Sequence, residues 1–184
     1  MAKAAVKALW TYDDYALLPD DGNRYEVLEG ELVMSPSPRT KHQIVSNNLS
    51  YILNDYVRKQ KIGRILVAPM DVILTPTNIV QPDLIFISNK NAKIITEKNI
   101  QGAPDLLVEI LSESTADRDL GAKMRIYARH KVAHYWLIDP EPESLEAYKL
   151  KRTKYELVGR YSTEDIFEPE LFPGLLITLK ELWD

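Results

Sequence analysis

An apolar run of six residues, 106–111 (Leu-Leu-Val-Glu-Ile-Leu), contains a single carboxylate, Glu109. A short run of Leu, Ile and Val without polar alternation is typical of a β-strand that is covered on both faces. Charged side chains are almost never fully buried without a partner, because an unpaired buried carboxylate costs several kcal/mol or takes up a proton. The sequence therefore predicts that Glu109 meets a cation, carries a proton, or lies in a water-filled cleft at the end of its strand.

The composition bounds the class of protein. The chain has 184 residues, of which 45% are hydrophobic, so we expect one globular domain spanning residues 1–184. No apolar stretch approaches the roughly 20 residues of a membrane span, and residues 1–7 lack the apolar core of a signal peptide. We therefore expect a cytoplasmic protein that does not bind membranes.

Cysteine and net charge narrow the possible chemistry. The chain has no cysteine, which excludes disulfides, thiolate zinc sites and cysteine nucleophiles, so any metal ligands must be carboxylates, histidines, carbonyls or water. The net charge of −4 argues against non-specific coating of nucleic acid, which normally needs a basic surface.

Hydrophobic periodicity predicts a mixed α/β fold. The apolar residues between 44 and 56 recur at helical spacings, and a second helix is expected over 117–130, with Leu120 in its buried stripe and with Ser114 and Asp117 as a capping box. Strands are expected over 64–74, 79–88, 106–111 and 132–138, and β-hairpins over 25–34 and 145–158. This order predicts a central mixed sheet flanked by helices, with a core at about 42–140, a C-terminal hairpin and tail at 141–184, and additional hairpins at both ends.

Two carboxylates are expected to meet in this sheet. Asp83 opens one interior strand and Glu109 lies within the next. Adjacent strands run about 4.8 Å apart, so carboxylates at matching heights can share a divalent ion. The competing Asp105 would lie roughly 13 Å from Glu109 along a regular strand, and we interpret it as a turn residue.

Lys123 is the candidate third member of the site. It lies on the helix after the Glu109 strand, where a lysine can bury its stem and extend its ammonium toward Glu109. There it would orient or deprotonate a water, or stabilise charge on a phosphate. The alternative is a surface pair with Asp119, worth about 0.3–0.5 kcal/mol.

The same residues carry a family resemblance. The order of helix, strand, strand beginning at Pro82-Asp83, strand carrying Glu109, helix and strand is similar to the core of the PD-(D/E)XK nuclease superfamily. More narrowly, the chain resembles the Uma-type family of restriction-endonuclease-like proteins over about residues 10–182. The matching motifs are the segments 25–32, 81–84, 103–112 and 133–140, together with His42, Asp119, Lys123 and Tyr127.

The resemblance implies a metal-dependent endonuclease acting on DNA. Asp83 and Glu109, with a backbone carbonyl near Ile110, would bind Mg²⁺ or Mn²⁺. In the superfamily the lysine usually stands two residues after the acid, where this chain has Leu111. The resemblance then implies that Lys123 takes over this role from the following helix.

Other groups are auxiliary candidates. His42 begins the first long helix and could contact metal or phosphate, although a lone histidine there is more often a cap or a surface group. Glu31, or its hairpin neighbour Glu26, could supply an outer carboxylate. The candidates for contact with the DNA backbone are Arg39, Lys41, Arg125 and Arg129. A single active centre would cut both strands only as a symmetric homodimer.

Two alternatives stay open. Leu111 and the acidic balance favour a catalytically inactive nuclease fold that binds nucleic acid or a protein partner. A third possibility is an interaction protein in which Glu109 is merely satisfied by Lys123 in a buried pair.

Overall fold

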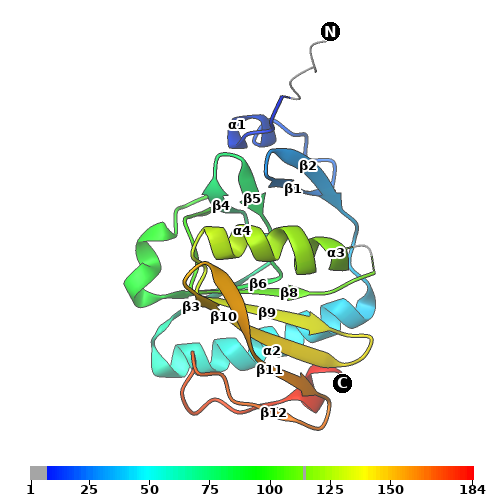
Figure 1. The fold of residues 1–184 in the computed structure, drawn as a ribbon, viewed down its shortest axis with the longest axis vertical. Coiled ribbons are helices and arrows are strands. Elements are labelled where there is room, and N and C mark those ends of the chain that lie inside the picture. The colour runs from blue at the N-terminus through cyan, green and yellow to red at the C-terminus, as the bar shows by residue number, and fades with distance from the viewer. Residues whose placement is uncertain (1–7, 114) are drawn as a thin grey trace.

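The computed structural model describes residues 8–113 and 115–184, so residues 1–7 and the capping box expected at Ser114 lie outside the described residues. The described residues form three sheets, namely a larger one of six strands, a smaller one of five strands and a two-stranded one near the C-terminus, and helices pack around the larger sheet (Figure 1). Its elements are α1 (Tyr12–Tyr15), β1 (Arg24–Leu28), β2 (Glu31–Ser35), α2 (Thr40–Gln60), β3 (Gly63–Val67), β4 (Val72–Thr75), β5 (Asn78–Val80), β6 (Leu84–Ser88), a 3₁₀-helix (Asn89–Ile94), β7 (Ile100–Gln101), β8 (Leu106–Ile110), α3 (Ala116–Arg118), a π-helix (Asp119–Lys123), α4 (Met124–Arg129), β9 (His134–Asp139), β10 (Ser144–Lys151), β11 (Lys154–Ser162), β12 (Ile166–Phe167), β13 (Ile177–Thr178) and a final 3₁₀-helix (Leu179–Leu182).

The larger sheet has the strand order β11-β10-β9-β8-β6-β3. β8 runs parallel to β9 and antiparallel to β6, so the sheet is mixed, as expected. All five residues of β8 are buried, which confirms the prediction of a strand covered on both faces.

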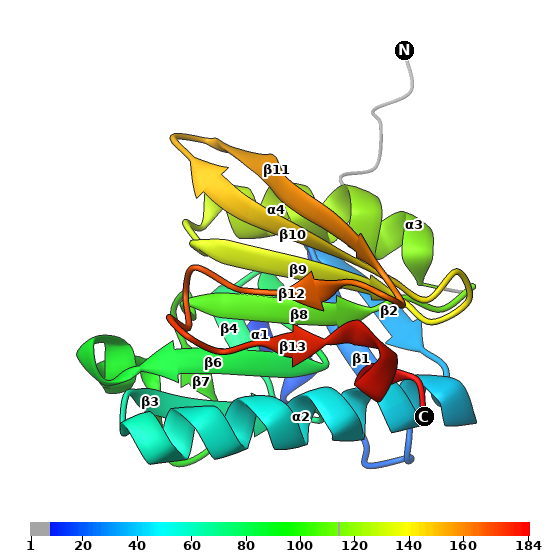
Figure 2. The same ribbon diagram turned by 90° about the horizontal axis from the view of Figure 1, so that it is seen from below.

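Helices cover both faces of this sheet. α2 packs on one face and α4 on the other (Figure 1). Alternate residues of β6 and β8 belong to the two buried clusters on these faces. The view in Figure 2 shows β12 and β13 beside α2, and their residues Phe167 and Ile177 belong to the same buried cluster as the α2 stripe. The mixed α/β class with flanking helices is therefore confirmed.

The smaller sheet has the order β2-β1-β5-β4-β7, and between β3 and β6 the chain crosses from the larger sheet to the smaller one and back. The strands expected over 64–74 and 79–88 are each divided: β3 and β6 belong to the larger sheet, whereas β4 and β5 belong to the smaller one. The turn at 68–71 and the segment 81–83 make the crossings. Asp83 therefore lies in the connection between β5 of the smaller sheet and β6 of the larger sheet.

The helix expected over 117–130 is interrupted. A π-helix at Asp119–Lys123 separates α3 from α4, and Leu120, expected in the buried stripe, is 47% exposed. A π turn is wider than an α turn and shifts the side chains that follow it around the axis. As a result Asp119 and Lys123 are buried in place of Leu120.

The end of α2 leads directly into the larger sheet. The helix ends at Lys61, which adopts a left-handed conformation with φ 54°, and Gly63 already belongs to β3. A Cβ on Gly63 would lie 2.3 Å from the carbonyl oxygen of Ile87, so glycine is needed there for close approach of the backbones. Within the described residues, no helix is long and apolar enough to cross a membrane.

Candidate active site

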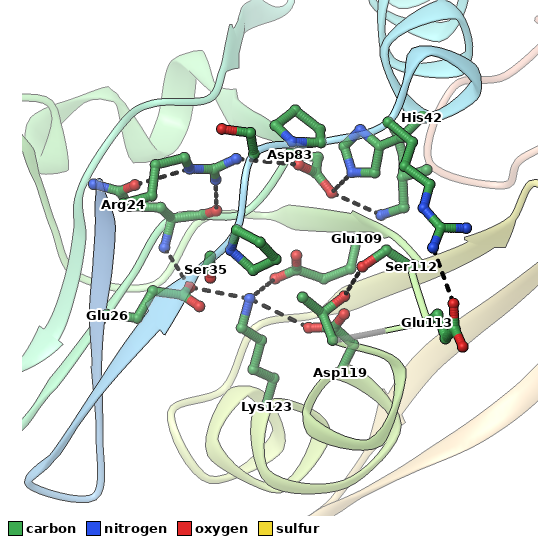
Figure 3. Close-up of a pocket in the computed structure, with 17 residues that line it drawn as sticks. Arg24, Glu26, Ser35, His42, Asp83, Glu109, Ser112, Glu113, Asp119 and Lys123 are labelled. Carbon is green, nitrogen blue, oxygen red and sulfur yellow. Dashed lines mark hydrogen bonds and ion pairs between the residues drawn. The ribbon is translucent and has the colours of Figure 1, made fainter. Parts of the chain in front are cut away.

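Asp83 and Glu109 come together where two neighbouring interior strands of the larger sheet, β6 and β8, begin and end. Leu84 of β6 pairs with Val108 of β8, so Asp83 and Glu109 are next in the antiparallel register. Both are buried, and both line a cavity of about 340 Å³ beside the larger sheet (Figure 3). The adjacency expected from the sequence is therefore present.

The Asp83 carboxylate is held from several sides. Its Oδ2 accepts a hydrogen bond from the backbone N–H of Ile110 at 2.8 Å and lies 3.2 Å from Nε2 of His42. Its Oδ1 lies 4.0 Å from Nη1 of Arg24. His42 thus contacts the carboxylate expected to bind metal, and within the described part of the chain its buried Nδ1 has no hydrogen-bond partner.

The Lys123 ammonium lies among three carboxylates. Its Nζ is 3.0 Å from Oε1 of Glu26, 3.0 Å from Oε1 of Glu109 and 3.3 Å from Oδ1 of Asp119. The surface pair considered for Lys123 and Asp119 is wrong, because both side chains are at most 5% exposed. The lysine instead reaches the Glu109 strand.

Tyr127 completes the surroundings of Glu109. It lies one turn after Lys123, and its hydroxyl donates a hydrogen bond of 2.6 Å to Glu109 Oε1. The Asp119 backbone carbonyl in turn accepts a hydrogen bond of 3.1 Å from the Tyr135 hydroxyl. The π-helix and α4 are thereby tied to β8 and β9.

Burial sets the charge states in this cluster. It raises the pKa of Glu109 well above its usual value, an effect that the positive charge of Lys123 opposes without cancelling, and it also raises the pKa of Asp119. Burial alone would lower the pKa of Lys123, but the charges of Glu109, Glu26 and Asp119 outweigh it and raise that pKa well above its usual value. Lys123 is therefore an ammonium, suited to stabilising negative charge and not to deprotonating water.

The other candidates occupy different places. Arg39 lines the same cavity and pairs with Glu113 at 3.0 Å, whereas Lys41 lines an adjoining cavity. Arg125 and Arg129 line a separate cavity between α4 and the β10–β11 hairpin, and Arg129 pairs with Glu29 at 2.8 Å.

Glu31 lies away from the cluster. It stands at the end of the hairpin and is exposed, whereas its hairpin neighbour Glu26 supplies the buried carboxylate. Asp105 caps a turn, because its Oδ2 accepts a hydrogen bond of 2.8 Å from the backbone N–H of Ser88.

The sequence predicted Glu26 only as a possible outer carboxylate and Asp119 only as a motif residue or surface partner of Lys123, and it did not single out Arg24. A signal existed for the first two: Glu26 stands in an alternating strand, and Asp119 precedes Lys123 by one helical turn. Arg24 carried no such signal, because only the crossing at 81–83 brings β1 against Asp83.

The carboxylate oxygens that line the cavity suit a hard divalent cation. Among the described residues, no three histidine or acidic side chains form a ready-made set of metal ligands. Mg²⁺, however, commonly keeps several waters and is held by one or two carboxylates. Asp83 and Glu109 supply two, and carboxylates outnumber cationic side chains around the cavity. The raised pKa of Glu109 indicates that its negative charge is incompletely compensated, so the residues fit such an ion.

Comparisons with known proteins agree with this architecture. The model of the Uma2 family, described as "Putative restriction endonuclease", matches residues 12–180. The structure is also similar to a crystal structure of a "putative nuclease belonging to DUF820" from Anabaena variabilis, with a TM-score of 0.77 and 21% identity, covering 94% of this chain and 97% of that chain. At that identity the likeness shows the fold alone. None of the curated proteins matched the chain. Because the family model spans most of its length and confirms the resemblance, the chain belongs to the Uma2 family.

Proposed function

We propose that the protein is a metal-dependent endonuclease that hydrolyses phosphodiester bonds in DNA. The observation that carries the proposal is the convergence of Asp83, Glu109 and Lys123 at one cavity, from three separate elements. Two carboxylates can hold a divalent ion that polarises a phosphodiester, and a fixed ammonium can stabilise the negative charge that develops during its hydrolysis.

Asp83 and Glu109, with the carbonyl of Ile110, would hold Mg²⁺ or Mn²⁺. When bound, such an ion polarises a phosphate oxygen and lowers the pKa of a water molecule. Asp83 is oriented for this by the Ile110 N–H and by His42. Supporting contacts of this kind fix the direction of a ligand and tune its basicity.

Lys123 would stabilise negative charge that develops on the phosphate. Glu26 and Asp119 keep the lysine protonated and position its ammonium beside Glu109. A fixed charge in a water-poor cavity contributes more than the same charge in solvent, because little reorganisation is needed.

The neighbouring cavities suggest a course for the DNA strand. The site cavity shares His42 with two further cavities, one along Gln43, Ser46 and Ser50 of α2 and one at Arg39 and Lys41. We propose that a DNA strand passes along the start of α2, with Arg39 and Lys41 as backbone contacts. Arg125 and Arg129 would then meet a more distant part of the duplex. Cutting both strands would require a homodimer with twofold symmetry.

The test is a titration of Mn²⁺ into the wild type and Asp83→Ala, followed by incubation of each with supercoiled plasmid. We expect the wild type alone to bind the metal and nick the plasmid. Metal binding without nicking would contradict the proposal and favour the second candidate, an inactive nuclease fold that binds nucleic acid or a protein partner. Leu111, at the position of the usual lysine, is the observation that favours that candidate.

Failure of both proteins to bind Mn²⁺ would leave Glu109 as a structural residue paired with Lys123. In that case Glu109→Ala, which leaves Lys123 paired with Glu26 and Asp119, should fold more stably than the wild type, because a costly buried charge has been removed.

A further inference from the structure

The geometry points to Arg24 as a further catalytic residue, which donates hydrogen bonds to the phosphate of the substrate, and to Gln81 as the residue that positions it. The inference rests on the proposed nuclease function and adds to it the group that recognises the substrate's anion. None of the motifs noted in the sequence includes Arg24.

Arg24 reaches the site from the smaller sheet. It is the first residue of β1, and its side chain, 26% exposed, lines both the site cavity and the adjoining cavity along α2. Figure 3 shows its guanidinium beside Asp83, whereas the Lys123 ammonium lies beside Glu109. The two carboxylates expected to bind metal thus have a cation on each side, Arg24 by Asp83 and Lys123 by Glu109.

Gln81 holds the guanidinium in place. Nε of Arg24 donates to the Gln81 side-chain oxygen at 3.2 Å, and Nη2 donates to the Gln81 backbone carbonyl at 2.9 Å. The Gln81 amide nitrogen donates to Asp71 at 2.8 Å and to the Tyr15 hydroxyl at 3.1 Å. Because these two contacts occupy the nitrogen, the amide oxygen must face Arg24.

The segment 81–83 also connects Arg24 to the carboxylates around Lys123. The Gln81 backbone N–H donates a hydrogen bond of 2.8 Å to Oε1 of Glu26, the oxygen that also contacts Lys123. The segment 81–83 therefore sets Arg24, Glu26 and Asp83 relative to one another. A guanidinium fixed in this way loses little side-chain entropy when it binds an anion.

Donors of Arg24 are left for a ligand. A guanidinium has five N–H donors, and the contacts to Gln81 use one on Nε and one on Nη2. Nη1 of Arg24 lies 4.0 Å from Oδ1 of Asp83, which is too long for a hydrogen bond. Pairing with Asp83 therefore does not account for Arg24, and its planar group of donors suits a phosphate, which it can bind through two parallel hydrogen bonds.

The expected chemistry is electrostatic. A cation cannot be a ligand of the metal, so Arg24 would contact the phosphate oxygens that face away from Asp83 and Glu109. Negative charge increases on these oxygens as water attacks the phosphorus atom and the bond to the leaving oxygen breaks. Hydrogen bonds from Arg24 would stabilise that charge, as Lys123 would from the other side.

The experiment measures binding of a short single-stranded oligonucleotide by the full chain in Ca²⁺, which uses the same oxygen ligands as Mg²⁺. The variants are Arg24→Ala, Arg24→Lys and Gln81→Ala. The matched control is Arg160→Ala, which removes an exposed arginine that pairs with Glu146 on the β10–β11 hairpin. Thermal unfolding and Mn²⁺ affinity are measured for each protein.

We expect Arg24→Ala to lower the oligonucleotide affinity about 10- to 100-fold, the loss of one or two charge-assisted hydrogen bonds. Its Mn²⁺ affinity should be equal to or higher than that of the wild type, because a nearby positive charge is gone. Arg24→Lys should recover part of the affinity, and added guanidinium ion should restore part of it in Arg24→Ala alone. Gln81→Ala should weaken binding in the wild type but not in the Arg24→Ala background.

Unchanged oligonucleotide affinity in Arg24→Ala would overturn the inference, as would wild-type protein that binds no oligonucleotide. The inference would also be overturned if Arg24→Ala lost Mn²⁺ affinity as much as oligonucleotide affinity and guanidinium ion restored neither. Arg24 would then be a residue that supports Asp83. Binding that depends on Arg24 in a protein that never nicks plasmid would refute the endonuclease proposal while retaining an Arg24 anion site.

Discussion

The Nζ atom of Lys123, the last residue of the π-helix, lies 3.0 Å from Oε1 of Glu109 in β8, although the two residues are 14 positions apart. The contact places a fixed positive charge beside the carboxylate that interrupts the apolar strand β8. Glu26 and Asp119 contact the same ammonium, so three buried carboxylates share Lys123 as their cation. Its stability and its chemistry are therefore testable with single substitutions.

Replacing Lys123 by methionine should destabilise the protein by about 3–5 kcal/mol, because it leaves buried carboxylates without their cation. The measurement is the free energy of unfolding in urea. Lys59→Met is the matched control, since Lys59 makes a similar contact of 2.8 Å with Asp55 on the exposed side of α2. That control should unfold like the wild type. Equal effects of the two substitutions would show that burial does not govern the Lys123 contacts.

Replacing Glu109 by glutamine should lower Mn²⁺ affinity by at least about 10-fold, since even the loss of a supporting contact near a metal costs about that much. Calorimetric titration would measure it. Asp105→Asn serves as the control, because Asp105 caps the turn at Ser88 and lies outside the site cavity. Mn²⁺ affinity that falls equally in both variants would speak against a metal site at Glu109.

Tyr127→Phe should destabilise the protein by about 1.5–3 kcal/mol, because it removes a buried hydrogen bond to a carboxylate. Tyr56→Phe, which removes a hydrogen bond to the carbonyl of Pro173 near the surface, should cost less. Denaturant unfolding of both variants provides the comparison. A larger loss at Tyr56 would contradict the importance assigned to Tyr127.

Stability should fall as the pH drops through the range where histidines titrate. Burial lowers the pKa of His134 below its usual value and the charge of Lys149 lowers it further, against weaker opposing effects of Glu170 and Asp105. The unfolded chain then binds more protons than the native one, so stability is full above about pH 6.5 and is lost on acidification toward the lowered native pKa.

The variant that tests this pH dependence is His134→Gln, followed by thermal unfolding across the acidic range. Its stability should vary less with pH than that of the wild type. The other histidine with a lowered pKa, His130, is present in both proteins and so does not affect their difference. Parallel pH profiles would exclude His134 as a source of the effect.

The chain's local patterns determined much of the fold and part of the site. The unbroken apolar run at 106–111 required a covered strand, and the carboxylate within it required a partner, since burying a lone charge is costly. The helical spacing of apolar residues before residue 57 predicted the long helix α2. The Pro-Asp dipeptide at Asp83 indicated the second carboxylate of the site. These features are local, so they can be read from neighbouring residues alone.

Only the tertiary structure decided which groups meet these carboxylates. Glu26 and Arg24 come from a different sheet, and they reach the site because the chain crosses between sheets at 81–83, which no periodicity records. The π-helix turns Asp119 and Lys123 inward and Leu120 outward, against the pattern expected for a regular helix. Sequence spacing determines which way side chains point only within a regular helix or strand. The partners of Glu109 are determined by packing and charge compensation between elements.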